Sequence, residues 1–432
     1  MFIHGTYQMS FLYNISQTVA LENVETKWSN ISAIHKYYVD GPFLVTKKIS
    51  VDDVEPIIEV HSLYDTKTYQ KFGLDILKNT YIVNHACENA NLEFLNWWLD
   101  SGLKLKYDER AIELASKNCH LPVLNWWLDS GLKVEYDEWA IYRVCSNGHL
   151  NVLNWWLGSG LKIKYDSWAI RGASANGHLH ILNWWLDSGL ELKYDSEAIK
   201  WASVNGHLHI LNWWLDSGLE LKYDSNAINS ASKNGHSHIL DWWLKSGLEL
   251  KYDQRAINAA SENAHLHVLN WFLGSGLELK YDEEALAFAS KNGHIAVLNW
   301  WLDSRLELKY NEWAIKWAIK WASERGHLHV LNWWLKSGLE LKYDSKAIDS
   351  TMENHQIQAI EWWIQSGLPL KYTKCLVTWA SENGYISILK AWAVAGLPFD
   401  SSEKAIELAL KHNQTEVLNW WEEMGFGLGP KN

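Results

Sequence analysis

The sequence predicts an all-α solenoid in which short helix-turn-helix repeats stack on one another. Three observations support this prediction. A block typified by Gly189–Ser217, GLELKYDSEAIKWASVNGHLHILNWWLDS, recurs every 29 residues. Within it, apolar residues follow the helical period in two successive segments. A repeat of this length is too short to bury a core of its own, so neighbouring copies must complete the core.

The first tryptophan of a Trp-Trp pair marks each copy. It falls at Trp97, Trp126, Trp155, Trp184, Trp213, Trp242, Trp271, Trp300, Trp333, Trp362 and Trp420, with Ala391 in the same place in one copy. One step, from Trp300 to Trp333, is 33 residues long. We therefore predict twelve repeats over residues 73–424, a non-repeating N-terminal region over 1–72 and a short C-terminal tail over 425–432.

Each copy divides into a loop and two helices. Residues 189–194 alternate apolar and charged side chains, which predicts a short extended segment with one buried edge. Asp195 is a good N-cap for a first helix, and Asn205-Gly206 ends that helix because glycine adopts the left-handed conformation freely. Residues 207–217 form the second helix. The recurring aspartates Asp108, Asp137, Asp166 and Asp195 are better explained as such caps than as acid–base pairs.

The helical period assigns faces to the two helices. The small stripe Ala198, Ile199, Ala202 and Ser203 predicts close packing of the first helix on a neighbour. In the second helix, His209, Asn212 and Asp216 form a polar stripe. Trp214 then lies in the apolar arc and should be core, while Trp213 should belong to a half-exposed ladder of indoles.

The stretch ASVNGHLHILNWWLDSGLEL resembles the ankyrin repeat, A-A-x-x-G-H-x-x-V-V-x-x-L-L-L-x-x-G-A-x-x, in all copies. The resemblance implies an ankyrin-like α-solenoid that binds a protein partner on its concave side, which the first helices line. Two departures mark a Trp-Trp-rich, short-finger variant. The T-P-L-H signature is absent, and each copy is four residues short of the usual 33. Short extended loops should therefore replace the full β-hairpin fingers.

Some copies depart from the pattern. In the first, Asn89-Ala90-Asn91 replaces Asn-Gly-His, and residues 1–72 form either a cap over the array or a separate docking module. The ninth contains WAIKWAIKWAS, which predicts a first helix one turn longer with Trp317 and Trp321 on one face. That copy opens with Arg305 where the others have glycine. The polar last copy should be a C-terminal cap.

Composition narrows the classes of function. The net charge of −12 argues against a general nucleic-acid binder. No run of about 20 apolar residues predicts a membrane span, and the first residues lack the pattern of a signal peptide. Three of the four cysteines replace serine or glycine, so no disulfide framework is implied. We expect a cytoplasmic monomer that binds neither nucleic acid nor membrane.

No catalytic motif is present, so we expect neither an enzyme nor a cofactor. Histidines recur at one position, His120, His149, His178, His207, His236, His265, His294 and His327, often as His-x-His. We interpret them as structural residues at a helix start and expect no metal, because residues two apart on a helix point about 200° from each other.

The outward stripe of the first helix varies between copies, while the core positions hardly change. Its members in the second to fifth copies are our predicted partner-binding residues: Arg110, Glu113, Trp139, Tyr142, Arg143, Trp168, Arg171, Glu197, Lys200 and Trp201. Tryptophan, tyrosine and arginine are typical of interface hot spots. Later copies have Asn226, Asn229, Lys233, Arg255, Asn258 and Glu262 on the same stripe. The alternative is drift on a tolerant surface.

These observations favour a non-enzymatic scaffold for protein–protein interaction, of adaptor type. Two alternatives stay open. Residues 1–72 could hold an enzymatic or regulatory activity, or Trp139, Trp168 and Trp201 could be stacking platforms for a carbohydrate or peptide. The ladder containing Trp213 is a second candidate surface, unless each indole lies flat against the next copy's second helix.

Overall fold

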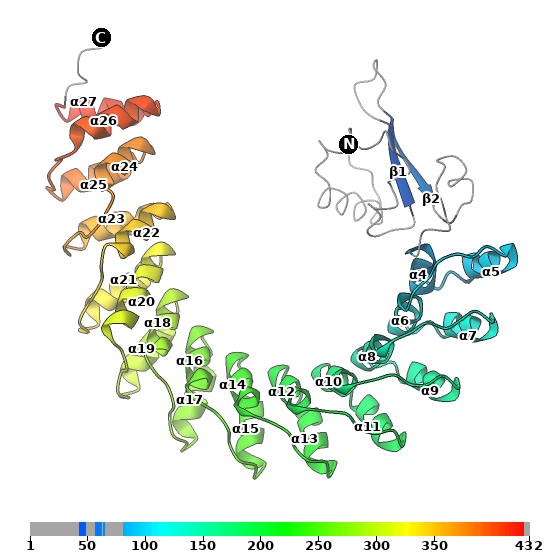
Figure 1. Cartoon of the computed structure of the whole chain (residues 1–432). Helices are drawn as coiled ribbons and strands as arrows, with labels where there is room; N and C mark the ends of the chain where they lie inside the picture. The colour runs from blue at the N-terminus through cyan, green and yellow to red at the C-terminus, as the bar shows by residue number, and fades with distance from the viewer. Residues whose placement is uncertain (1–42, 49–56, 63, 65–80, 427–432) are drawn as a thin grey trace. The chain divides into compact units, whose positions relative to one another are not determined.

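The computed structural model describes residues 43–48, 57–62, 64 and 81–426 (Figure 1). They belong to two compact units, residues 1–198 and 199–432, and each unit is considered by itself. The predicted boundary at 72/73 and most of the tail at 425–432 lie outside the described residues, so the predicted domain division stays a prediction.

Helices alternate along residues 81–426 in pairs, and each pair is one repeat. The first helices are α4 (Tyr81–Glu88), α6 (Arg110–Lys117), α8 (Glu138–Asn147), α10 (Ser167–Ala175), α12 (Ser196–Val204), α14 (Ser225–Lys233), α16 (Gln254–Glu262), α18 (Glu284–Lys291), α20 (Glu312–Glu324), α22 (Lys346–Glu353), α24 (Leu376–Glu382) and α26 (Ser402–Lys411). The second helices are α5 (Leu92–Ser101), α7 (Leu121–Asp129), α9 (Leu150–Gly158), α11 (Leu179–Asp187), α13 (Leu208–Asp216), α15 (Ser237–Lys245), α17 (Leu266–Gly274), α19 (Ile295–Asp303), α21 (Leu328–Lys336), α23 (Ile357–Gln365), α25 (Ile386–Val394) and α27 (Thr415–Glu423).

Within each unit the repeats stack in register. In most repeats the first helix packs on the second helix of its own repeat and on the first helix of the next, and these first helices pack more extensively on one another than the second helices do. The small stripe that includes Ala202 and Ser203 is fully buried, which permits this close approach. The prediction of an ankyrin-like α-solenoid of stacked helix-turn-helix repeats is confirmed in each unit.

The loops between repeats are short extended segments, as predicted. Residues 81–426 contain no strand, so no β-hairpin finger is present there. Leu190, Leu192 and Tyr194 are half-buried, while Glu191 and Lys193 are exposed, in agreement with the predicted alternation. The cap aspartates are confirmed as well: Asp137 accepts a hydrogen bond from the amide of Trp139, and Asp166 from that of Trp168.

A two-stranded antiparallel sheet precedes the repeats and was not predicted. Strand β1 (Phe43–Lys48) pairs with β2 (Ile57–Ser62), with Phe43 opposite Ser62 and Lys48 opposite Ile57. Just after β2, the ring of Tyr64 lies 4.9 Å from that of Phe94, and its hydroxyl hydrogen-bonds Nδ1 of His85. Tyr64 therefore lies against the first repeat.

The second tryptophan of each pair forms the core. Trp127, Trp156, Trp185, Trp214, Trp243, Trp301, Trp334, Trp363 and Trp421 are all fully buried, as predicted. Most of the indole N–H groups whose contacts are resolved donate to the first helix of the preceding repeat, for example Trp243 to Ser203 Oγ and Trp127 to Cys87 Sγ. Trp156 is an exception, because its indole N–H and Ser116 Oγ are both buried without a hydrogen-bond partner. The serine column of the first helix therefore accepts from most of these indoles, and cysteine replaces serine where the sequence has one.

The first tryptophan is half-buried in most pairs, as predicted, and more buried than predicted in four of them. Trp213 is only 9% exposed, and Trp184, Trp333 and Trp420 are also buried. Indole N–H groups of these first tryptophans donate to a side-chain oxygen on the second helix of the preceding repeat. Examples are Trp126–Asn96, Trp155–Asn125, Trp184–Asn154, Trp242–Asn212, Trp271–Asp241, Trp300–Asn270, Trp333–Asn299 and Trp362–Asn332. This column therefore joins repeats, and the polar stripe supplies its acceptors.

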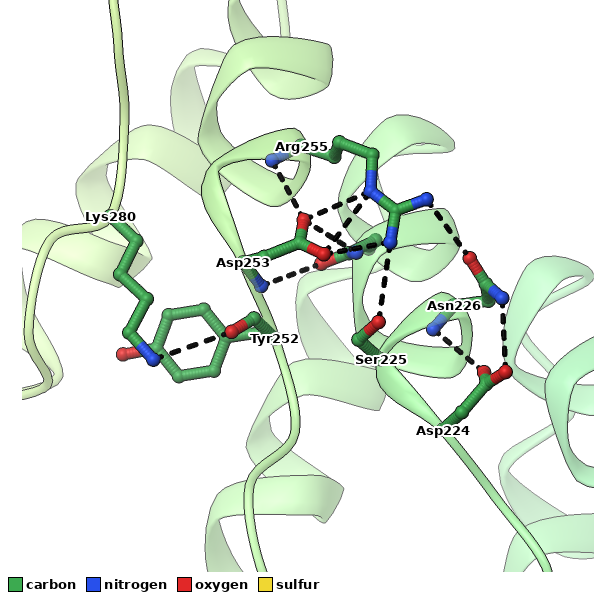
Figure 2. Close-up of polar contacts among 8 residues, drawn as sticks. Asp224, Ser225, Asn226, Tyr252, Asp253, Arg255 and Lys280 are labelled. Carbon is green, nitrogen blue, oxygen red and sulfur yellow. Dashed lines mark hydrogen bonds and ion pairs between the residues drawn. The ribbon is translucent and has the colours of Figure 1, made fainter.

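The Lys-Tyr-Asp segment of each loop also joins neighbours. The Tyr252 hydroxyl donates to the carbonyl oxygen of Glu278 in the next loop, at 2.7 Å. Lys280 of that loop lies over the Tyr252 ring at 4.7 Å and donates to the Tyr252 carbonyl oxygen, as Figure 2 shows. The same pair of contacts recurs between Tyr281 and Lys309.

The ninth repeat differs as predicted. Helix α20 has 13 residues, and Ile315 and Ile319 are buried on one face while Trp317 and Trp321 lie half-buried on another. Arg305 keeps the left-handed conformation of the glycines it replaces, with φ of 57°. In the last repeat Glu422 and Glu423 are exposed, as a cap requires. Phe426, in the predicted tail, packs against Phe399 and Trp421.

Candidate functional site

An exposed aromatic cluster lies on the first helices α8 and α10, within residues 1–198. The ring of Tyr142 lies edge-on to Trp139 at 5.3 Å and to Trp168 at 6.0 Å, and the two indoles are 6.3 Å apart. Trp139 is 43% exposed and Trp168 is 44% exposed. Gly172 leaves room for Tyr142, since a Cβ there would lie 3.1 Å from its ring. We call Trp139, Tyr142 and Trp168 the aromatic cluster.

Two arginines border the aromatic cluster. Arg143 lies 5.8 Å from the Trp139 ring and pairs with Glu113 of the preceding repeat at 3.1 Å. Arg171 lies 4.0 Å from the Trp168 ring and pairs with Asp195 at 3.0 Å. These contacts hold the guanidinium groups and the rings in one arrangement across neighbouring repeats. The structure thus brings together six of the predicted binding residues.

The remaining predicted residues lie apart from this cluster. Arg110 is exposed on α6, and Glu197 is half-buried in the first turn of α12. Lys200 and Trp201 belong to residues 199–432, where the ammonium group of Lys200 lies 5.5 Å from the Trp201 ring and Trp201 is exposed.

The prediction that the whole stripe faces outward is wrong at one position of the repeat. Asn229 and Asn258 are buried, and they donate to Asp253 and Asp282, the N-terminal aspartates of the following first helices. Arg171 makes the equivalent contact to Asp195. The first helices pack so closely that a side chain at this position reaches the next repeat's cap, and it therefore stabilises stacking.

Figure 2 shows the neighbouring polar contacts around Asp253, the cap of α16. Arg255 donates from Nε and Nη2 to both carboxylate oxygens of Asp253, at 3.0 and 2.7 Å. It also reaches Ser225 and Asn226 of the preceding first helix. The side-chain bond from Arg255 lowers the pKa of Asp253. These contacts hold Arg255 in place, although the residue type at this position differs between repeats.

Sequence reasoning missed a second aromatic surface, on α20 in residues 199–432. The rings of Trp313, Trp317 and Trp321 follow one another at 5.7 and 5.0 Å, and Phe288 of α18 continues the row 6.0 Å from Trp321. Trp313 is 55% exposed. Lys320 lies over Trp317, and Lys291 lies over Trp321. We call these four rings the aromatic row. The spacing i, i+4, i+8 in the ninth copy was the signal available in the sequence.

The described residues contain no group of three or more histidine, cysteine or carboxylate side chains that could hold a metal ion. Burial raises the pKa of the Cys87 and Cys145 thiols to about 12, so these thiols are protonated at neutral pH. No described helix combines the length and hydrophobicity that crossing a membrane demands.

The histidine column occupies helix starts, as predicted. His149 and His265, for example, are the N-cap residues of α9 and α17. The geometric reason we gave against convergence is wrong, however. The rings of His265 and His267 are 5.7 Å apart, because the first histidine lies outside the helix with ψ of 69°.

Fold and surface together define a helix-turn-helix repeat protein of ankyrin-like architecture with exposed aromatic groups on its first helices. No family model matches the chain. It is 39% identical over 101 residues to the uncharacterized protein L696 of Acanthamoeba polyphaga mimivirus, a match that covers 20% of this chain and 32% of that protein. The chain thus spans about a third of that relative's length.

Among solved structures, the crystal structure of the human ASB11 ankyrin repeat domain is similar to this chain, with a TM-score of 0.36 and 15% identity. The match covers 44% of this chain and 96% of that domain. A TM-score this low gives no basis for carrying a function from one protein to the other.

Proposed function

We propose that this protein is a non-enzymatic scaffold that binds a protein partner through its first helices. The single observation that supports this proposal is the aromatic cluster: two indoles more than two-fifths exposed, with a tyrosine between them and an arginine beside each. Exposing indoles to water is unfavourable, and tryptophan, tyrosine and arginine are the residues that contribute most to protein interfaces.

The contacts within the aromatic cluster make it suitable for binding. Ring contacts hold the three aromatic side chains, and ion pairs to Glu113 and Asp195 hold the two arginines beside them. Little conformational entropy is therefore lost when a partner docks. Both arginines have a carboxylate partner, which leaves a surface with little net charge. We therefore propose a partner that contributes apolar and aromatic side chains.

The carbohydrate alternative receives less support. Sugars stack on open indole faces, yet the Arg171 guanidinium covers one face of Trp168 at 4.0 Å. The other alternative is an enzymatic or regulatory activity in residues 1–72, and most of these residues lie outside the described part of the chain. Removal of that region would separate the two hypotheses, since capture of the partner should persist if the repeats bind it.

Affinity capture with the full-length chain tests the proposal. We expect a set of proteins that the parent chain recovers and the variant Trp139→Ala/Tyr142→Ala/Trp168→Ala loses. The matched control is Leu157→Ala/Leu186→Ala, which removes two exposed leucines from the second helices α9 and α11. Circular dichroism should show that both variants are folded.

The purified partner should then bind the cluster variant at least about tenfold more weakly, which corresponds to about 1.4 kcal/mol. The control should bind as the parent does. Equal recovery and equal affinity for all three chains would reject the aromatic cluster as the contact surface.

We propose that the aromatic row on α20 is a further contact of the same kind, because Trp313 is the most exposed of its indoles. The variant Trp313→Ala/Trp317→Ala should reduce recovery of a partner. If it recovers the same proteins as the parent in the same yield, the aromatic row has no role in binding.

A further inference from the structure

The histidines at the starts of the second helices lie in the joints between repeats. In residues 199–432 we call His236, His265, His294 and His327 the N-cap histidines. The Nε2 atom of His265 lies 3.0 Å from the carbonyl oxygen of Lys233, and that of His294 lies 2.9 Å from the carbonyl oxygen of Glu262. A carbonyl oxygen only accepts, so Nε2 carries the proton and donates to the preceding first helix.

In three of the N-cap histidines, His236, His265 and His327, the other ring nitrogen lies against a glycine. A Cβ placed on Gly235 would be 3.0 Å from Nδ1 of His265, and one on Gly293 would be 3.1 Å from Nδ1 of His327. These glycines have φ of 76° and 77° and end the preceding first helices. Nδ1 of His265 has no hydrogen-bond acceptor among the described residues. If Nδ1 of His265 were protonated, its N–H group would have no acceptor in the described part of the protein.

A second histidine lies beside most N-cap histidines. His238, His267 and His329 have rings 5.6 to 5.7 Å from those of His236, His265 and His327. Each of these second histidines donates from Nε2 to a carbonyl oxygen of the preceding repeat, those of Gly206, Gly235 and Gly293. A joint between two repeats can therefore contain two imidazoles in contact.

The groups that act on the N-cap histidines offer no compensation for positive charge. His236 is affected by His238, His265 and His207, and by the carbonyl of Val204. His265 is affected by His267 and His294, and by the carbonyl of Lys233. For His327 the groups are His329, Arg325 and His294, and the carbonyl of Lys291. Every charged group in these sets is a histidine or an arginine, so charging one imidazole disfavours charging the next.

We infer that His236, His265 and His327 make the joints between repeats acid-sensitive, so that protonation of these residues separates neighbouring repeats while neutral imidazoles hold them together. Burial is the largest cause that lowers the pKa of His236, His265 and His327. At pH values between this lowered pKa and the ordinary histidine pKa, the folded state binds fewer protons than the unfolded state. The stabilisation is complete above the ordinary histidine pKa of about 6.5 and is lost as the pH falls through the lower pKa of the folded state.

The chain itself contains the substitution that tests this inference. Gln356 and Gln414 occupy the N-cap position in later repeats. Gln414 Nε2 donates to the carbonyl oxygen of Glu382 at 2.9 Å, which is the contact His294 makes with Glu262. Gln356 Nε2 donates instead to the carbonyl oxygen of Asn354 in its own repeat. Gln414 thus shows that a glutamine at this position is able to make the hydrogen bond between repeats, and a glutamine cannot titrate.

The experiment compares the full chain with the variant His236→Gln/His265→Gln/His294→Gln/His327→Gln. Thermal unfolding is measured at about pH 7.5 and pH 5.5, on either side of the ordinary histidine pKa. We expect similar midpoints for both chains at the higher pH, and a fall at the lower pH that is at most half as large in the variant. An equal fall in both chains would overturn the inference.

The control variant is His412→Gln, outside the column, whose Nε2 lies 3.3 Å from a Glu382 carboxylate oxygen. It should show the acid-induced fall of the parent. If the fourfold variant does not fold, imidazole titration of the parent by NMR decides instead. Midpoints below about 6.5 for His236, His265 and His327 support the inference, and midpoints at or above that ordinary value overturn it.

Discussion

Trp155 donates its indole N–H to the side-chain oxygen of Asn125 at 2.8 Å, and the two residues belong to successive repeats. Equivalent pairs recur within each unit, so the first tryptophan and the polar residue before the preceding Trp-Trp pair form a recurring contact between neighbouring repeats. A single repeat cannot make these contacts. They therefore contribute to the coupling of neighbours, which determines stability in stacked repeats.

Replacing Asn125 tests this coupling. Asn125→Ala should destabilise the protein by about 1 kcal/mol, the typical net contribution of one hydrogen bond. Trp155→Phe removes the donor, and in a double-mutant cycle with Asn125→Ala the two losses should not add. Urea unfolding measures each free energy. Additive losses would mean that the bond contributes nothing to stacking.

The sequence predicted the repeat and its faces, since a 29-residue period and the helical spacing of apolar residues are local properties. It did not predict which residues meet across a joint. That depends on the offset between repeats: Trp155 bonds a residue 30 positions earlier, and Trp243 one that is 40 earlier. The burial of Asn229 and Asn258 follows from the same close packing. Helix periodicity also failed for the first residue of each His-x-His, because an N-cap residue is not helical.

Glycine to alanine substitutions should distinguish backbone strain from steric contact between repeats. Gly235 and Gly276 have φ of 76° and 74°, so alanine costs each about 1 kcal/mol of backbone strain. A Cβ on Gly276 meets nothing within 4 Å, whereas one on Gly235 lies 3.0 Å from the His265 ring. Gly235→Ala should therefore be the more destabilising, by about a further 1 kcal/mol.

Thermal and urea unfolding of both variants measure this difference. His265→Ala removes the ring that the new methyl group meets, so the extra cost of Gly235→Ala should disappear in that background. Both variants should fold, because Ala264 occupies the position equivalent to Gly235 with φ of 59°, and Arg305 occupies the position equivalent to Gly276 with φ of 57°. If Gly276→Ala proves as harmful as Gly235→Ala, the histidine ring is not the constraint.

Arg305 offers a stabilising substitution. Its φ is 57°, and the glycines at the equivalent position of the neighbouring repeats, Gly276 and Gly338, have φ of 74° and 77°. A non-glycine residue pays about 1 kcal/mol for the left-handed conformation, so Arg305→Gly should stabilise the protein by about that amount. The measurement is the midpoint of urea unfolding. Arg325→Gly is the control, since Arg325 has φ of −100° and glycine there should destabilise.

The four cysteines should separate into two reactive and two unreactive thiols. Cys87 and Cys145 are completely buried, and burial raises their pKa to about 12. A thiol reagent attacks the thiolate, which is scarce at that pKa and out of reach in the folded chain. We therefore expect two fast equivalents in the native protein, from Cys119 and Cys375, and four after unfolding. More than two fast equivalents would show that the core opens readily.

Serine should replace either buried cysteine without loss of stability. The Trp185 indole donates to Cys145 Sγ, and the Trp243 indole makes the same contact to Ser203 Oγ. Because the oxygen is the better acceptor, Cys145→Ser should unfold at the same urea concentration as the parent or at a higher one. Cys145→Ala leaves the buried indole N–H without an acceptor and should cost about 1–3 kcal/mol. The two variants differ by one oxygen atom, so equal stabilities would mean that this hydrogen bond does not hold the tryptophan core.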